Sequence, residues 1–378
     1  MTDASIYLDH NASTPLLPEV LAAMLPYLRE HFGNPSSGHA FGRRARAAVE
    51  LARAQVAALI GAAPDSLVFC SGGTEANNLA IRGVIAVRGD RRHLVTSVAE
   101  HPATAVPCTW LEGQGVAITR VGLGADGQVR LDELAAAIRG DTALVTLIHA
   151  HNETGVIVAA AAAAGLAHAR GAWIHLDAAQ SVGKHPVEVA VLGVDLLSIA
   201  GHKLGAPKGV GALYVGPQVT LAPLLLGANH ERGLRPGTEN VASIVGLGVA
   251  CEVARRGLDE RIARFLAQRE RLWRALAEAV PGLRRHGEPA SCLANTLHLR
   301  FPGVSGEQLL ARAPELAAST GSACHDGHGQ APAVLLAMGV AEPEARGALR
   351  LSLGPGTTDS EIDAAARALV RAWRSSLM

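Results

Sequence analysis

The stretch WIHLDAAQSVGKHPVEVAVLGVDLLSIAGHKLGAPKGVGALYV, residues 173–215, contains three apolar runs of strand length: WIHLD, DLLSIA and VGALYV. Four similar runs precede it, namely SLVFC at 66–70, HLVTSV at 93–98, VAITRV at 116–121 and ALVTLI at 143–148. Helical, alanine-rich segments lie between most of them. Such alternation is typical of a mostly parallel sheet covered on both faces. The pattern therefore predicts an α/β fold with a doubly wound sheet, whose ligands bind beyond the carboxyl ends of the strands.

The pattern changes after residue 239. A long amphipathic helix is expected from about 239 to 279, with a break at Arg255-Arg256-Gly257. Two further strands, at 296–301 and 348–353, and helices at 305–311, 331–338 and 358–373 indicate a smaller α+β unit. We therefore expect a large ligand-binding domain of residues 16–250 and a small domain made of residues 1–15 and 251–378.

The composition of the 378 residues excludes several classes of protein. Lys+Arg and Asp+Glu are both 34, and aromatic residues are 3% of the chain, which argues against nucleic-acid binding. The N-terminus lacks the pattern of a secretory signal. The longest apolar stretch, Val156 to Ala167, is shorter than the roughly 18 residues of a membrane span and predicts a packed helix. We expect a cytoplasmic protein that acts on small molecules, with no membrane partner.

Three polar clusters follow predicted strands. SGGTEANN at 71–78 opens a helix, and its glycines and free N–H groups favour an anion. Asp177 ends the strand WIHLD, and Lys203 follows DLLSIA. Taken singly, each feature has another explanation. The motif at 71–78 fits a capped helix, Asp177 fits a helix cap or a metal ligand, and Lys203 fits a surface charge. Together, an anion cradle, a carboxylate and an amine suit pyridoxal 5'-phosphate (PLP), which needs partners for its phosphate, its ring nitrogen and its aldehyde.

With these clusters the sequence resembles the cysteine desulfurases and the related selenocysteine lyases, PLP enzymes of the class V aminotransferase group. The motifs that carry the resemblance span nearly the whole chain: YLDHNASTP at 7–15, GNPSS at 33–37, SGGTEANN at 71–78, EH at 100–101, NETG at 152–155, HLDAAQ at 175–180, GHK at 201–203, RPGTEN at 235–240, GSAC at 321–324 and LRLSLG at 349–354. The resemblance implies PLP-dependent fold type I, with PLP in the large domain and a catalytic cysteine loop in the small one.

The resemblance also implies roles for individual residues. Lys203 would form the Schiff base with PLP, Asp177 would pair with the ring nitrogen, and His101 would stack on the ring and move protons. The other cofactor contacts would come from Gly73, Thr74, Asn152, Gln180, His202 and Thr238. Gln180 would lie near the phenolic oxygen, and Thr74 and His202 would bind the phosphate.

Two further implications concern the partner subunit and the substrate. Thr238 would reach the phosphate of the neighbouring subunit's cofactor, which implies a homodimer with shared active sites. Arg350 would bind the substrate carboxylate with help from Asn152, and Asn34 is also expected at the substrate. A planar guanidinium suits bidentate binding of a carboxylate.

Cys324 decides the chemistry that the resemblance implies. Its thiolate would take sulfur from L-cysteine as a persulfide, leave L-alanine and deliver the sulfur to an acceptor such as an iron–sulfur scaffold. Glycines around it and the lack of apolar periodicity over 319–330 predict a mobile loop. Five cysteines without a CxxC pair argue against a disulfide framework or zinc finger. The other four are expected to be buried apolar residues: Cys70, Cys108, Cys251 and Cys292.

The segment after Cys324 has a second interpretation. Its two histidines, His325 and His328, would lower the pKa of the thiol if they are cationic, or would bind a metal together with it. No fourth ligand with evident spacing accompanies the run 324–328, so we expect no metal.

Three departures from the desulfurase pattern leave the substrate open. Ala200 stands where desulfurases usually have a phosphate-binding serine, and His230 adds an imidazole to the glycine-rich segment 227–232. The loop 321–339 looks more like that of selenocysteine lyases. Cysteine desulfurase is the main hypothesis. Selenocysteine lyase or another PLP-dependent C–S lyase is the alternative, an idle PLP-fold binding protein is a third, and an aminotransferase would have no use for Cys324.

Overall fold

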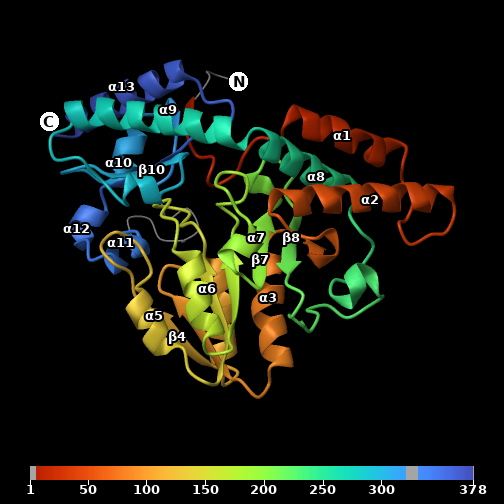
Figure 1. Ribbon diagram of the computed structural model, residues 1–378. Coiled ribbons are helices and arrows are strands. Elements are labelled where there is room, and N and C mark those ends of the chain that lie inside the picture. Colours follow the sequence, from red (N-terminus) through yellow and green to blue (C-terminus); the bar gives the residue numbers. More distant parts are fainter. Residues whose placement is uncertain (1–5, 321–330, 378) are drawn as a thin grey trace.

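The computed structural model describes residues 6–320 and 331–377, and its centre is a seven-stranded sheet in the order β2-β8-β7-β6-β5-β3-β4 (Figure 1). Only β8 runs antiparallel to its neighbours. The strands are β2 (Leu67–Cys70), β3 (His93–Ser97), β4 (Ala117–Val121), β5 (Thr142–Ile148), β6 (Trp173–Asp177), β7 (Leu196–Ala200) and β8 (Gly211–Val215). Each predicted run forms a strand, and the mostly parallel α/β fold is confirmed.

Apolar side chains cover both faces of this sheet. In β2, Leu67 and Phe69 pack in one buried cluster, whereas Val68 and Cys70 pack in another. Successive residues of a strand point to opposite faces, so the clusters lie on the two sides. The helices of this unit are α1 (Pro18–Arg29), α2 (Ala40–Leu59), α3 (Gly73–Val87), α4 (Pro102–Glu112), α5 (Leu131–Ala137), α6 (Ala160–His168) and α7 (Val189–Leu192). The sheet is therefore doubly wound.

The predicted helix over 156–167 is wrong in its first residues. Helix α6 begins at Ala160, because Val156 and Ile157 form bridges with Cys292 and Ala150 instead of a helical turn. Within the described ranges, no helix is long and apolar enough to cross a membrane.

Helices α8 (Val241–Arg256) and α9 (Leu258–Ala279) meet at Gly257 and lead into a smaller α+β unit. Its antiparallel sheet has the order β12-β10-β9, from β9 (Arg284–Arg285), β10 (Thr296–Arg300) and β12 (Ala348–Ser352). Its helices are α10 (Gly306–Ala311), α11 (Ala333–Ala337), α12 (Glu342–Ala345) and α13 (Asp359–Ser376). This unit has a core of its own, with α9 and α13 side by side (Figure 1).

The beginning of the chain belongs to this smaller unit. Strand β1 (Ile6–Tyr7) pairs in parallel with β11 (Leu316–Ala317), and Asp9 forms a bridge with Ser352 at the end of β12. Residues 10–14 then continue toward the carboxyl ends of the large sheet, where Thr14 donates from its N–H to the carbonyl of His202 at 3.0 Å. The two units therefore meet where the ligand site is expected.

Candidate active site

The predicted site residues follow the carboxyl ends of parallel strands. The connections after β2, β3, β5, β6 and β7 carry them in turn: Gly73 and Thr74, His101, Asn152, Asp177 and Gln180, and His202 and Lys203. These strands run in the same direction, so their carboxyl ends share one edge of the sheet. The topology thus brings together residues that lie far apart in the sequence.

The start of α3 forms an open cradle. Its N-cap residue, Gly72, has a φ of 152°, which favours glycine, and within the described chain no side chain caps this first turn. A Cβ atom on Gly73 would lie 3.3 Å from the Cβ of Ala200 and 3.9 Å from that of Ala179. Uncapped N–H groups at a helix start favour an anion, so the cradle fits a phosphate. Ala200 lies directly at this cradle.

Asp177 is buried at the end of β6 and has two donors. Asn77 donates from Nδ2 to its Oδ2 at 2.7 Å, and the N–H of Ala179 donates to its Oδ1 at 3.0 Å. Bonds of this kind stabilise the ionised carboxylate and fix its direction. The arrangement fits a partner for a protonated ring nitrogen. Asn77 lies in the motif at 71–78, but the sequence alone did not indicate its role.

A second carboxyl group, Glu100, lies near Asp177 and is partly buried, with its Oε2 shielded from solvent. Burial raises its pKa to about 8, and the nearby charge of Asp177 adds to the rise. The Oγ of Ser97 donates to its Oε1 at 2.5 Å, and its Oε2 has no hydrogen-bond partner in the described part of the chain. Glu100 is therefore protonated at neutral pH and adds no negative charge beside Asp177.

His101 is the N-cap of α4, where its Nδ1 accepts from the N–H of Ala103 at 3.1 Å. When the ring is neutral, this bond places its proton on Nε2. His101 and Thr74 line one surface hollow of about 580 Å³ between α3 and α4. The predicted ring-stacking residue and the predicted phosphate ligand therefore face a common space.

Lys203 ends the short helix η2 (Gly201–Lys203) after β7. Its Nζ donates to the carbonyl of Asn11 at 2.6 Å and to that of Ala12 at 2.8 Å. Gln180 donates from Nε2 to the same Asn11 carbonyl at 2.9 Å. The N-terminal segment therefore joins Lys203 to Gln180, two residues that the sequence assigned to one cofactor.

His202 precedes Lys203 and is half-buried. Burial lowers its pKa to about 4, and the charges of Lys203 and Lys208 lower it further. Its Nδ1 lies 3.5 Å from the Oγ of Ser13. A neutral imidazole still has one N–H, so His202 is able to donate to a phosphate oxygen.

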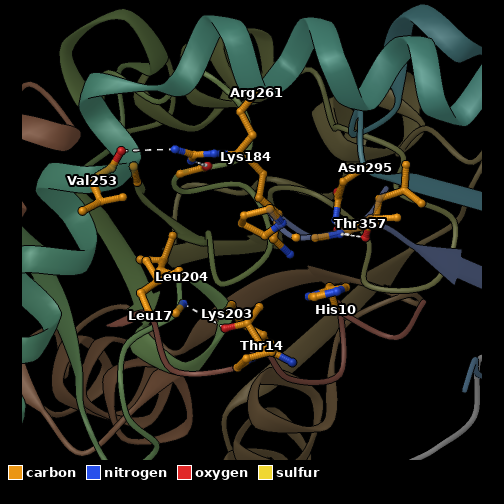
Figure 2. Close-up of a pocket in the computed structure, with 18 of the residues that line it drawn as sticks. His10, Thr14, Leu17, Lys184, Lys203, Leu204, Val253, Arg261, Asn295 and Thr357 are labelled. Atoms are coloured by element: carbon orange, nitrogen blue, oxygen red, sulfur yellow. Dashed lines mark hydrogen bonds between the residues drawn. The ribbon is translucent and has the colours of Figure 1, made fainter. Parts of the chain in front are cut away.

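A cavity of about 430 Å³ lies behind Lys203, where the two units meet (Figure 2). Lys203 and Lys184 both line it, together with His10 from the N-terminal segment. Its other walls are largely apolar and include Leu17 and Phe265. Lys203 thus lines a space that is separate from the hollow at His101.

Arg350 is buried in β12 and makes two contacts near the site. It donates from Nη2 to Oδ1 of Asp9 at 2.6 Å and from Nη1 to the carbonyl of Asn152 at 2.9 Å. Its Nε is buried with no partner among the described residues. The structure thus brings Arg350 to Asn152, as expected of a carboxylate-binding pair, and adds Asp9, which the sequence analysis missed.

Two predicted site residues lie elsewhere. Asn34 is in the connection between α1 and α2, where its Oδ1 accepts from the N–H of Ser36 at 2.9 Å. Thr238 is exposed in the segment before α8.

The cysteines divide into two groups. The four expected to be apolar are buried and unpaired, which confirms that prediction: Cys70, Cys108, Cys251 and Cys292. Burial raises the pKa of the Cys251 thiol to about 12 and that of Cys292 to about 11, so neither is a thiolate at neutral pH. Cys324, with His325 and His328, lies outside the described residues. Within them, no three His, Cys, Asp or Glu side chains gather as a metal site.

Comparison with known proteins agrees with this geometry. The family model Aminotransferase class-V matches residues 6–365. Cysteine desulfurase 2 of Trichormus variabilis is 45% identical over 360 residues, which cover 95% of this chain and 90% of the relative. A solved structure titled NifS-like protein has a TM-score of 0.92 at 32% identity and covers 99% of this chain and 100% of its own. One titled SspA in complex with cysteine has a TM-score of 0.80 at 34% identity, covering 93% and 99%.

Proposed function

Because the chain belongs to the cysteine desulfurase family of class-V aminotransferases, we propose that it binds PLP, converts L-cysteine to L-alanine and takes the sulfur onto Cys324 as a persulfide. One observation carries the proposal: the cradle at Gly73, the carboxylate of Asp177 and the amine of Lys203 lie at one edge of the sheet. When bound, PLP supplies an electron sink for negative charge at the substrate Cα.

The chain's own residues would hold the cofactor at three points. The first turn of α3 and the neutral imidazole of His202 would bind its phosphate. Asp177, oriented by Asn77 and by the N–H of Ala179, would accept a hydrogen bond from the protonated ring nitrogen. Lys203 would supply the amine for the aldehyde. Each of these groups matches a different part of PLP in charge and in hydrogen-bonding capacity.

The substrate would bind through Arg350, with Asn152 and Asn34 beside its amino and carboxylate groups. His101 would move the Cα proton, since a neutral imidazole accepts a proton near physiological pH. The thiolate of Cys324 would then attack the substrate sulfur. The S–S bond forms as the Cβ–S bond breaks, and the electron pair stays with the substrate carbon, which a proton converts to alanine.

We also propose that the chain acts as a homodimer with shared active sites. Several large apolar side chains are exposed on two segments. One is the segment between β8 and α8, which holds Thr238, and the other is the connection between α1 and α2, which holds Asn34. They include Leu226, which is 91% exposed, and Phe32, which is 78% exposed and stacks on Phe41. Such exposure favours burial against a second copy. Thr238 and Asn34 would then reach the partner's site.

Three further parts of the proposal rest on family membership and on the sequence. The persulfide would pass its sulfur to an acceptor protein such as an iron–sulfur scaffold. The reaction would take place in the cytoplasm, where unpaired thiols stay reduced. The large domain would comprise residues 16–250, and residues 1–15 and 251–378 would form the small domain that carries Cys324.

The test is an assay of the purified, PLP-loaded protein with L-cysteine. Alanine and sulfide should appear in equal amounts under reducing conditions. Cys324→Ala should abolish sulfide release and keep the visible absorbance of bound PLP, whereas Lys203→Ala should lose that band. Cys251→Ala is the matched control, because its buried thiol is not a thiolate. Sulfide release at the normal rate by Cys324→Ala would rule out the persulfide.

Selenocysteine lyase is the second candidate, and Ala200 favours it. Its methyl group lies at the phosphate cradle, where desulfurases usually present a hydroxyl. The ratio of kcat/KM for L-selenocysteine to that for L-cysteine decides between the two substrates. If this ratio is far higher for the wild type than for Ala200→Ser, the protein is a selenocysteine lyase.

A further inference from the structure

Lys184 is a buried amine that has no acidic partner. It is 7% exposed, and its Nζ donates to Oε1 of Gln180 at 2.8 Å and to Oδ1 of Asn11 at 3.0 Å. No carboxylate in the described ranges forms an ion pair with it. The basic groups around it are Lys203, Arg350, His10 and His202, and the cavity that it lines also includes Tyr7, Arg261 and one carboxylate, Glu361, which forms no ion pair with it in the described ranges. Its surroundings therefore accept hydrogen bonds but do not compensate a positive charge.

Burial among these basic groups lowers the pKa of Lys184 well below its ordinary value. A neutral amine has two N–H donors, and two amide oxygens accept from Lys184. The hydrogen bonds are thus complete without the charge, which explains how the amine tolerates burial.

The bonds to Lys184 determine which way two amides point. The carbonyl of Asn11 accepts from Nε2 of Gln180, so turning the Gln180 amide over would place oxygen against oxygen. The Oδ1 of Asn11 also accepts from Asn295, and its Nδ2 donates to Oγ1 of Thr296 at 2.9 Å. Lys184 therefore holds both amide oxygens on its own side. The nitrogen of Gln180 is left facing the carbonyl that also binds Lys203.

The composition of the chain supports a specific need for lysine. Only three lysines occur among the 378 residues, against 31 arginines, and they fall at 184, 203 and 208. An arginine side chain stays charged under all ordinary conditions. A neutral amine fits the position between Gln180 and Asn11, which a permanently charged arginine would not. Figure 2 shows Lys184 and Lys203 on the walls of one cavity.

We propose that Lys184 is a positioning residue that fixes the amides of Gln180 and Asn11 and through them sets the environment of Lys203. This inference rests on the proposed function only for the part that Gln180 and Lys203 play toward PLP. Without Lys184, Oε1 of Gln180 and Oδ1 of Asn11 lose their shared donor, and the ammonium of Lys203, which already binds the Asn11 carbonyl, is the amine left to donate to them. That contact stabilises the charged form, so the pKa of Lys203 rises.

The first experiment measures the lysines directly. Protein labelled with ¹³C at the ε-carbon of lysine gives three signals, which Lys184→Met and Lys208→Met assign. The Lys184 signal should titrate below that of the exposed Lys208, and Lys184→Met should raise the pKa of Lys203 by about one unit. Lys208→Met is the matched control and should leave it unchanged. An unchanged Lys203 pKa in Lys184→Met, or a Lys184 that titrates with Lys208, overturns the proposal.

A second experiment uses the PLP-loaded protein. Lys184→Met should move the pH midpoint of the visible absorbance change upward and lower kcat more than it changes KM, whereas Lys208→Met should do neither. If Lys184→Met does not fold, Lys184→Gln keeps a donor and should show a smaller shift in the same direction. The lysine titration needs no cofactor. If the protein fails to bind PLP, the proposed function is wrong, but the lysine titration still decides the role of Lys184.

Discussion

Arg350 donates from Nη2 to Oδ1 of Asp9 at 2.6 Å, so the side chain proposed to bind the substrate carboxylate already pairs with a carboxylate of the chain. Asp9 is held by its bridge to Ser352, two residues after Arg350. A rigid partner of this kind keeps the guanidinium in one orientation. Arg350 is therefore positioned before substrate arrives.

Asp9→Asn should raise the KM for L-cysteine about tenfold with kcat changed less than about twofold, because a weaker bond leaves Arg350 free to turn. Steady-state assay of sulfide release measures both constants. Asp363→Asn is the matched control, since Asp363 pairs with Arg271 at 2.6 Å on the surface, and its KM should not change. A lower KM in Asp9→Asn would show instead that Asp9 competes with the substrate.

Glu100→Gln should change how stability depends on pH. The folded pKa of Glu100 is about 8 and the ordinary value is 4.5, so the folded state retains a proton that the unfolded state loses. The wild type therefore loses stability as pH rises from 4.5 through 8, and the variant does not. Urea unfolding at pH 5, 7 and 9 should show the variant gaining on the order of 2–4 kcal/mol relative to the wild type.

The matched control for this prediction is Glu112→Gln. Glu112 is an exposed carboxylate paired with Arg120 at 2.8 Å, and that pair lowers its pKa. The stability of Glu112→Gln relative to the wild type should not rise with pH. Parallel curves for Glu100→Gln and the wild type would mean that Glu100 is ionised in the folded protein.

Acid should destabilise the protein through its buried histidines. Burial lowers the pKa of His149, His151 and His175 to about 4, from an ordinary value of 6.5. They are neutral in the folded state, so their contribution is complete above pH 6.5 and is lost as pH falls toward 4. His175→Gln should flatten the acid limb measured by urea unfolding. His168→Gln, at an exposed histidine, should leave it as steep as in the wild type.

Glu231→Gln should lower the free energy of unfolding by about 3 kcal/mol, because it removes the carboxylate that binds both Nη atoms of buried Arg53 and leaves only the exposed Glu50 as its acidic partner. Glu231 accepts from Nη1 of Arg53 at 2.9 Å and from Nη2 at 2.7 Å, and also from the N–H of Phe69 at 2.8 Å. Chemical denaturation measures the loss. The control is Glu252→Gln, whose arginine partners Arg255 and Arg256 are both exposed, so the change should be small. Equal effects of the two variants would refute the buried-pair argument.

The sequence predicted the strands well because parallel strands buried on both faces are nearly continuous apolar runs. It also predicted where Lys203 and Asp177 lie, since strand ends determine the position of residues that follow them. It did not predict Asp9, Asn77 or Lys184 as partners. Their bonds join segments separated by long stretches of chain, and no local period records such contacts. The roles of Thr238 and Asn34 depend on a second subunit, which a single chain does not contain.

The pairing of β1 with β11, and of Asp9 with Ser352, has a consequence for biosynthesis. The segment that contacts Lys203 emerges from the ribosome first, but its partner strands are translated last. Until β12 has been released, Asp9 lacks Ser352, and the carbonyls of Asn11 and Ala12 are held near the amine only from the side of the large sheet, for example by Gln180. The nascent polypeptide therefore completes its reactive centre only near the termination of translation, even if the large sheet has folded earlier.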